Sequence, residues 1–125
     1  MARILLAEDD ATLAKILEFK LEAKGYSVTV AHDGHAAWEY ALCINFDLII
    51  TDYNMPKMKG ADLCRHIRND SRYDQTPIIM TSSFDRDLDM VKLIEELRLS
   101  AFFAKPFTLA DLIKKVEEVL AECHA

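Results

Sequence analysis

The sequence is poor in the residues that bend, break or cross-link a chain: it has three glycines, three prolines and three cysteines among 125 residues. An odd number of cysteines without a CxxC pair excludes a disulfide framework and a zinc site of the usual spacing, and indicates a reducing compartment. No apolar run approaches the length of a membrane span, and the first residues lack the apolar stretch of a signal peptide. We therefore expect a cytoplasmic protein without a membrane partner.

Positive charge is also scarce, with 15 basic against 21 acidic residues and a formal net charge of −6. This balance argues against a nucleic-acid surface, because phosphate binding requires a basic face. A small group of acids around a cation remains compatible with it. With 51% hydrophobic residues and no linker or repeat, residues 1–125 are expected to form one domain with a substantial core.

Five short apolar runs alternate with segments of helical periodicity, and we interpret the runs as β-strands. Four are almost continuously apolar, as in parallel strands covered on both faces, whereas the second alternates and is expected at a half-exposed edge. The runs are RILLA (3–7), YSVTVA (26–31), DLIIT (47–51), PIIMT (77–81) and AFFA (101–104).

The segments between the runs carry apolar stripes at helical spacing, which we assign to the core. Asp85 is the expected N-terminal cap of the fourth helix, and Thr108 with Asp111 has capping-box spacing at the fifth. Five βα units predict an α/β fold, a doubly wound parallel sheet with helices on both faces. The expected core positions of the first four helices are Leu13, Ile16, Leu17, Leu21, Ala37, Tyr40, Ala41, Ile44, Leu63, Ile67, Leu88, Val91 and Ile94.

In such a sheet, ligands bind at the carboxyl ends of the strands. Clustered carboxylates repel one another unless a cation lies among them, and Mg²⁺ accepts carboxylate and phosphate oxygens. A carboxylate is also a nucleophile toward phosphorus, while an amine and a hydroxyl can hold phosphoryl oxygens. The residues that follow the first, third, fourth and fifth strands supply this set: Glu8, Asp9 and Asp10; Asp52; Ser82; and Lys105.

Each of these residues also has an ordinary structural explanation. An aspartate after a strand commonly caps a loop, and the acids of EDD before a helix commonly cap that helix, which is the role expected of Asp10. Their joint occurrence at the ends of four strands favours a site for phosphoryl chemistry over four unrelated caps.

The motifs LLAEDD, DYNMPKMKG, PIIMTSS and AKPF, in this order and spacing, resemble the receiver domain of two-component response regulators, with a likeness to chemotaxis regulators. The resemblance covers essentially the whole chain and implies a flavodoxin-like sheet of strand order 2-1-3-4-5. It assigns the phosphoacceptor to Asp52 and the switch residues to Ser82, Lys105 and Phe102. It assigns a Mg²⁺ site, which can also take Mn²⁺, to Glu8, Asp9, Asp52 and the backbone carbonyl of Asn54.

The resemblance further implies a cis peptide bond before Pro106, and a tuning of phosphoryl hydrolysis by Asn54 and Phe84. We expect the phosphoryl group to be lost slowly, because the ring of Phe84 obstructs the attacking water. Two departures from the family stand out. Phenylalanine replaces the more common tyrosine at Phe102, and Arg98 with Leu99 replaces a Gly–Ala pair before the fifth strand.

The implied function is a signalling switch rather than an enzyme. A sensor histidine kinase or a phosphotransfer protein is the expected phosphoryl donor to Asp52. The surface of the fourth helix, fifth strand and fifth helix then changes to control an unidentified output protein, as a monomer or as a phosphorylation-dependent dimer.

Other functions stay open from the sequence. The chain is alternatively a phosphorelay intermediate, or the excised receiver of a longer transcriptional regulator. A phosphohydrolase with an aspartate nucleophile typically has a second aspartate two residues later, where this chain has Asn54. A phosphorylation-independent adaptor is disfavoured because every key position carries a competent residue.

Overall fold

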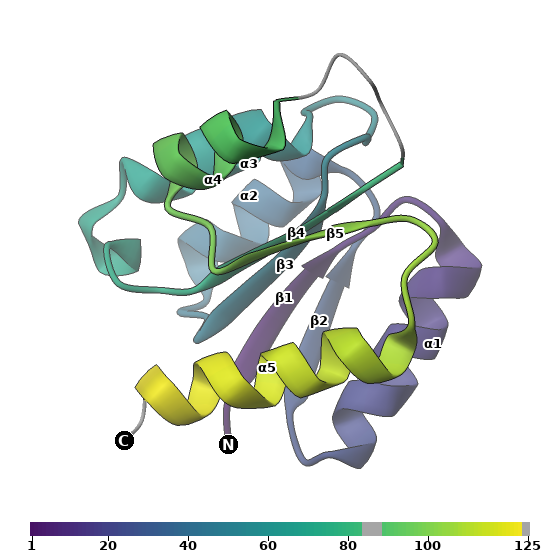
Figure 1. Ribbon diagram of the computed structural model, residues 1–125. Helices are drawn as coiled ribbons and strands as arrows, with labels where there is room; N and C mark the ends of the chain where they lie inside the picture. Colours follow the sequence, from purple (N-terminus) through teal and green to yellow (C-terminus); the bar gives the residue numbers. More distant parts are fainter. Residues whose placement is uncertain (84–88, 124–125) are drawn as a thin grey trace.

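The computed structural model describes residues 1–83 and 89–123, in which five parallel strands form one sheet in the order β2-β1-β3-β4-β5. Helices α1 and α5 cover one face of the sheet and α2, α3 and α4 cover the other (Figure 1). The predicted α/β fold and its strand order are therefore confirmed. The strands are β1 (Arg3–Ala7), β2 (Ser27–Ala31), β3 (Leu48–Asp52), β4 (Ile78–Ser82) and β5 (Ala101–Ala104). The helices are α1 (Ala11–Ala23), α2 (Gly34–Cys43), α3 (Gly60–Arg68), α4 (Met90–Leu97) and α5 (Leu109–Cys123), with a short 3₁₀ turn, η1 (Ser71–Tyr73), before β4.

Strands β3 and β4 each extend one residue beyond the predicted apolar run. Asp52 pairs with Thr81, and Ser82 pairs with Ala104, so both polar residues belong to the sheet rather than to the loops that follow. The carbonyl of Ser82 also accepts a hydrogen bond from the backbone N–H of Lys105 at 2.7 Å. Two of the candidate site residues are therefore fixed by the strand ladder itself.

The two edges of the sheet differ from the sequence prediction in one respect. The alternating strand β2 lies at an edge, as predicted. The run AFFA forms the other edge, where β5 pairs only with β4, and its two faces are partly rather than fully covered. Phe102 and Phe103 are accordingly only partly buried, on opposite faces of the sheet.

Three of the predicted core side chains lie on the surface. Ile16, Tyr40 and Val91 are 40%, 41% and 65% exposed. The apolar stripe of each helix is wider than its line of contact with the sheet, so the residues at its border face solvent. In α4 the buried positions are Leu93 and Leu97.

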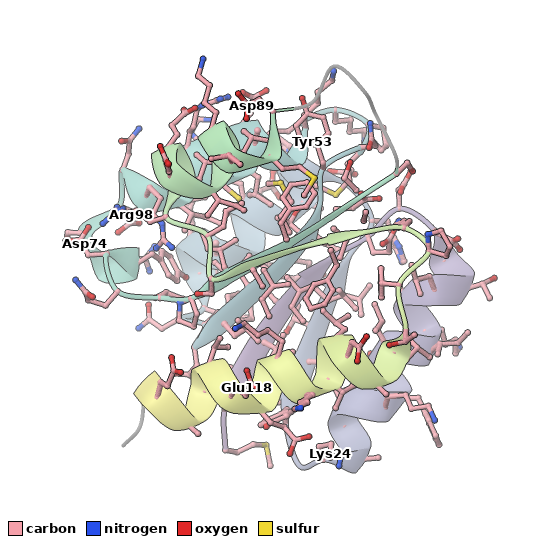
Figure 2. All side chains as sticks on the ribbon, viewed as in Figure 1. Lys24, Tyr53, Asp74, Asp89, Arg98 and Glu118 are labelled. Carbon is pink, nitrogen blue, oxygen red and sulfur yellow. The ribbon has the colours of Figure 1, made fainter. Side chains whose placement is uncertain are left out.

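The ends of α4 also differ from the prediction. The helix begins at Met90, and Asp89 rather than Asp85 is its cap, accepting a hydrogen bond from the backbone N–H of Lys92 at 3.0 Å. Asp85 and Leu88 lie outside the described residues. At its other end the helix has Arg98 as its C-terminal cap (Figure 2). Arg98 has φ +53°, a left-handed conformation that favours glycine.

We expect Arg98→Gly to stabilise the protein. A glycine adopts this φ without steric conflict, so the change relieves about 1 kcal/mol of backbone strain, less the entropy that glycine adds to the unfolded chain. Urea unfolding would show a higher midpoint with an unchanged slope. A lower midpoint would contradict this prediction. It would mean that the Arg98 side chain stabilises the folded protein by more than the strain of its left-handed backbone destabilises it.

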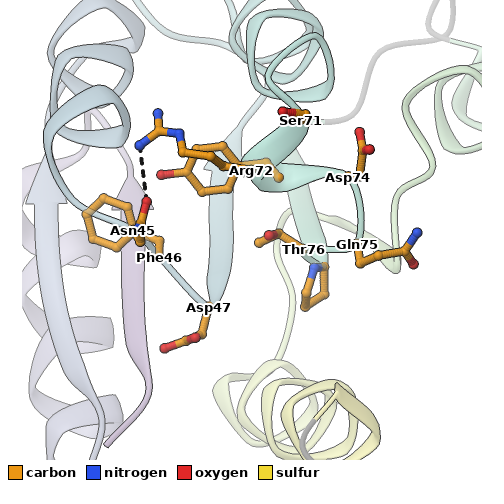
Figure 3. Close-up of a pocket in the computed structure, with 10 residues that line it drawn as sticks. Asn45, Phe46, Asp47, Ser71, Arg72, Asp74, Gln75 and Thr76 are labelled. Atoms are coloured by element: carbon orange, nitrogen blue, oxygen red, sulfur yellow. Dashed lines mark hydrogen bonds between the residues drawn. The ribbon is translucent and has the colours of Figure 1, made fainter.

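A hollow of about 520 Å³ opens at the amino ends of β3 and β4, beside Asp47, Ser71 and Pro77 (Figure 3). Arg72 lies along it and donates hydrogen bonds to the Asn45 side chain at 3.1 Å and to backbone carbonyls at the end of α2. This end of the sheet is opposite to the carboxyl ends, where the acids gather. The hollow is therefore separate from the candidate site.

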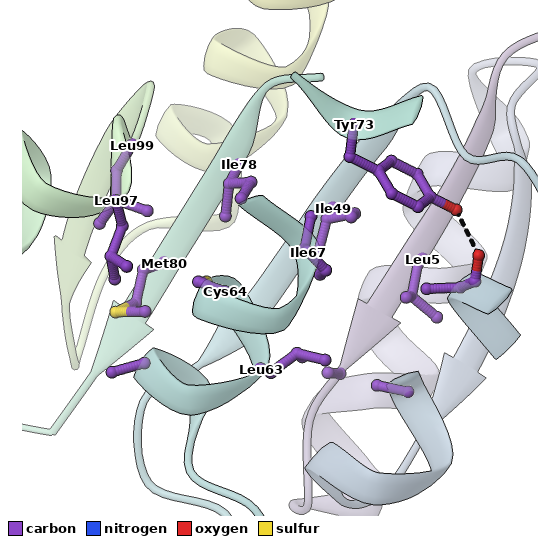
Figure 4. Close-up of a cluster of buried hydrophobic side chains, with 14 of the residues drawn as sticks. Leu5, Ile49, Leu63, Cys64, Ile67, Tyr73, Ile78, Met80, Leu97 and Leu99 are labelled. Atoms are coloured by element: carbon purple, nitrogen blue, oxygen red, sulfur yellow. Dashed lines mark hydrogen bonds between the residues drawn. The ribbon is translucent and has the colours of Figure 1, made fainter. Parts of the chain in front are cut away.

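Tyr73 anchors the same turn to the core. Its ring is fully buried among Leu5, Ile49 and Ile67, and its hydroxyl lies 2.6 Å from the carbonyl of Ala41 (Figure 4). The turn η1 is thereby held against the core at the amino end of the sheet. Within the described ranges, no helix combines the length and the apolar character that a membrane crossing requires.

Candidate functional site

Three acids meet at the carboxyl end of the sheet. Glu8 and Asp9 follow β1 and Asp52 ends β3, which lies beside β1, and one carboxylate oxygen from each lies within 4.8 Å of the others. Glu8 and Asp52 are 2% and 3% exposed, whereas Asp9 faces solvent. The adjacency of β1 and β3 brings together acids that are more than 40 positions apart in the sequence.

Lys105 contacts two of the three acids. Its Nζ lies 3.0 Å from Oδ2 of Asp52 and 3.1 and 3.3 Å from the two carboxylate oxygens of Glu8. The residue follows β5, and the peptide bond that joins it to Pro106 is cis. Two buried carboxylates therefore share one ammonium group, which leaves one negative charge of this trio uncompensated.

The pKa values of Glu8 and Lys105 reflect this imbalance. Burial and the nearby charge of Asp52 raise the pKa of Glu8 from 4.5 to about 7. Burial disfavours the charged form of Lys105, but its hydrogen bonds to Asp52 and Glu8 outweigh that effect and raise its pKa. Near neutral pH the lysine is thus charged, while Glu8 readily takes up a proton.

This predicts a pH dependence of the metal-free protein. Because the pKa of Glu8 is higher in the folded state than its ordinary value of 4.5, its contribution to stability is complete below pH 4.5 and is lost as the pH rises through about 7. We expect Glu8→Gln, which resembles the protonated form, to flatten the decline. Urea midpoints measured in EDTA from pH 5 to pH 8 test this, and parallel curves for the two proteins would refute it.

Ser82 and Asn54 form a second contact at the site. The Ser82 hydroxyl lies 3.3 Å from Oδ1 of Asn54 and 2.9 Å from the carbonyl of Ser83. The backbone N–H of Asn54 in turn donates to Oδ1 of Asp52 at 3.3 Å. Ser82 is 1% exposed and lies on β4, the strand beside β3, which ends with Asp52.

Three further residues were singled out by the sequence: Asp10, Phe102 and Phe84. Asp10 caps α1, accepting hydrogen bonds from two backbone N–H groups, which is the role expected of it. Phe102 packs against the cluster under α3 and α4, beside Met80. Phe84 lies outside the described residues, so its expected effect on hydrolysis stays a prediction.

The donor set fits a hard divalent cation. Three carboxylates converge, two of them buried, and the one positive charge of Lys105 does not balance theirs. Mg²⁺ prefers oxygen ligands and keeps several waters, which suits a site with one solvent-facing acid. The arrangement can therefore bind a divalent metal next to a buried carboxylate.

Two contacts of the site were missed by the sequence analysis. Lys105 was expected to meet a phosphoryl oxygen, but it also pairs with Glu8. Asn54 was assigned a carbonyl ligand and a role in hydrolysis, but its side chain also contacts Ser82. The only sequence signal for either contact is that all these residues follow or end strands, which places them at one edge without fixing their partners.

A doubly wound sheet with a triad of acids, a lysine and a buried serine at its carboxyl edge defines a receiver-type signalling domain. Residues 4–117 match the family described as "Response regulator receiver domain". The chain belongs to this family. The matched residues therefore form a receiver domain, which is a signalling switch rather than a classical enzyme.

Individual relatives agree with this assignment. The chain is 36% identical to the chemotaxis protein CheY1 of Helicobacter pylori, over 94% of this chain and 96% of that protein. It is also 36% identical to the transcriptional regulatory protein CpxR of Escherichia coli, over 99% of this chain and 51% of that protein. The chain therefore spans about half the length of the first curated relatives that it matches. The structure of the chemotaxis response regulator CheY4 of Vibrio cholerae superposes with a TM-score of 0.86 at 30% identity, over 95% of this chain and 98% of that one.

Proposed function

We propose that residues 1–125 act as one cytoplasmic receiver unit in which Asp52 accepts a phosphoryl group from the phosphohistidine of a sensor histidine kinase or phosphotransfer protein. The observation that carries the proposal is the meeting of Glu8, Asp9 and Asp52 beside Lys105. A carboxylate oxygen of Asp52 forms the new P–O bond, the P–N bond of the donor breaks, and its electron pair returns to the imidazole nitrogen.

The chain's own groups position and neutralise the transferred group. Lys105, already 3.0 Å from Asp52, compensates charge on a phosphoryl oxygen, and Ser82 donates its hydroxyl to another. Glu8, Asp9, Asp52 and the backbone carbonyl of Asn54 would hold Mg²⁺, or Mn²⁺ in its place. When bound, the metal neutralises phosphoryl charge between the acids.

The signal leaves through the surface of α4, β5 and α5. Recruitment of Ser82 to the phosphoryl group breaks its contact with Asn54, and Phe102, which lies beside Met80 of β4, rotates inward. Met90 and Val91 on α4 are 41% and 65% exposed, which supports this face as the one that meets an output protein or a second copy of the chain.

Two biological settings are supported by the relatives. Similarity to CheY1 along nearly the whole of that protein favours a receiver that acts by itself or in a phosphorelay. Similarity to about half of CpxR favours the receiver of a longer transcriptional regulator. The chemistry proposed at Asp52 is the same in both settings.

Intact mass spectrometry after incubation with Mg²⁺ and acetyl phosphate tests the proposal. We expect one added phosphoryl group in the wild type, none after EDTA and none in Asp52→Asn, while the control Asp62→Asn, which alters an exposed acid on α3, is modified normally. An adduct that persists in Asp52→Asn would contradict the assignment of the acceptor. No adduct, combined with an unchanged structure in beryllofluoride, would favour a phosphorylation-independent adaptor.

A further inference from the structure

The start of α2 touches the backbone of the loop that follows the phosphoacceptor. Gly34 is the first residue of α2, and a Cβ atom added to it would lie 2.1 Å from the carbonyl oxygen of Met58 and 2.8 Å from its carbonyl carbon. Real Cβ atoms do not approach backbone so closely, so any larger residue must displace one partner. Glycine at this position permits a contact between two segments that both lie at the carboxyl end of the sheet (Figure 1).

A second contact joins the neighbouring residues of the same two segments. Lys57 Nζ lies 3.8 Å from Oδ2 of Asp33, and Asp33 also caps α2 by accepting a hydrogen bond from the backbone N–H of Ala36 at 2.7 Å. Lys57 has φ +68°, so the loop turns sharply where it meets Asp33 and Gly34, the two residues that we call the α2 corner. Two consecutive loop residues therefore face two consecutive residues of the α2 corner.

The loop, residues 53–59, packs the buried side chain of Met55 into the core, and its backbone hydrogen bonds to other segments lie at its two ends. At the start, Tyr53 donates its backbone N–H to Thr81 on β4 at 2.7 Å, and at the end Gly60 donates to Tyr53 at 3.0 Å. Asn54 lies just inside the first of these anchors. Its carbonyl is the one proposed metal ligand that comes from this loop rather than from a strand end.

We propose that Gly34 and Asp33 are positioning residues for the metal site: the α2 corner presses on the loop at Met58 and Lys57 and so sets where the Asn54 carbonyl lies relative to the acids. This inference rests on the proposed function. A residue that orients a metal ligand from outside the coordination sphere commonly changes metal affinity by about 10- to 100-fold when it is replaced.

Gly34→Ala is the direct test, and Gly25→Ala is its matched control. Gly25 has φ +96° and no atom within 4 Å of an added Cβ, so alanine there strains the backbone without touching the loop. We expect Gly34→Ala to weaken Mg²⁺ binding about tenfold or more in calorimetric titration, and Gly25→Ala to bind as the wild type does despite its lower stability. In the metal-free protein, amide resonances of residues 53–58 should shift in Gly34→Ala only.

The outcomes separate the two proposals. A folded Gly34→Ala with wild-type Mg²⁺ affinity overturns the positioning role and leaves the proposed function intact. Equal losses in both glycine variants also overturn it, because affinity would then follow stability. A wild type that binds no Mg²⁺ and accepts no phosphoryl group overturns the proposed function and this inference with it.

A milder variant keeps the test decisive if Gly34→Ala does not fold. Asp33→Asn retains a good helix cap and removes the ion pair with Lys57. We expect metal-free amide shifts at residues 57 and 58 in this variant. A spectrum unchanged at those positions would overturn the role of the corner.

Discussion

Gly60→Ala is expected to destabilise the protein by about 3 kcal/mol or more, the range of overpacked sites that cannot relax. A Cβ atom at this position would lie 2.1 Å from the carbonyl oxygen of Asp52 and 2.9 Å from Cα of Tyr53. Both are backbone atoms at the end of a buried strand, so no side chain can move aside. Either α3 shifts away from the sheet or the end of β3 is displaced.

Thermal and urea unfolding measure this effect. For a domain of this size, 3 kcal/mol corresponds to a melting temperature lower by about 10–15 °C. Gly25→Ala is the control, with an expected loss of about 1 kcal/mol from its left-handed backbone alone. A Gly60→Ala protein that melts with the control or above it would show that the helix accommodates the methyl group.

Lys105→Met is expected to destabilise the metal-free protein by about 3–5 kcal/mol at pH 8, as breaking a buried ion pair does. The substitution keeps much of the apolar side-chain volume and removes the charge that faces Asp52 and Glu8 at 3.0 and 3.1 Å. Without this charge the pKa of Glu8, already about 7, rises further. The loss should therefore be smaller at pH 5, where Glu8 is protonated.

Urea unfolding at pH 5 and pH 8, with and without Mg²⁺, separates charge from packing. Millimolar Mg²⁺ should restore part of the stability at pH 8, because the cation replaces the missing positive charge. Lys114→Met, at an exposed position of α5, is the matched control and should change stability by less than about 0.5 kcal/mol. A loss in Lys105→Met that is the same at both pH values would mean that packing rather than charge is responsible.

The pattern of apolar residues was sufficient to predict the α/β fold class, whereas the strand order came from the resemblance to receiver domains. The continuous run Leu48–Ile50 predicted a buried strand and the alternation around Val28 predicted an edge strand, and the structure confirms both. The errors lie where local pattern and tertiary contact disagree. Val91 continues the apolar stripe of α4, yet the helix presents Leu93 and Leu97 to the sheet instead.

The candidate site was predictable as a set of residues but not as a network. The rule that strand ends meet at one edge brings Glu8, Asp52 and Lys105 together from sequence alone. Whether Lys105 pairs with one acid or with both depends on side-chain geometry after the sheet has twisted, as does the contact of Ser82 with Asn54. These are angstrom-scale differences that no spacing encodes.

By itself, the sequence determined the fold class, the edge of the sheet that carries chemistry and the residues that gather there, because hydrophobic period and strand ends are local properties of the chain. Only the tertiary structure decided which acids share the lysine and how close the helices stand to the loops. The contacts of Gly34 with Met58 and of Gly60 with Asp52 illustrate this. Each joins segments that meet only after the core has packed, and a glycine in the sequence does not say which backbone will approach it.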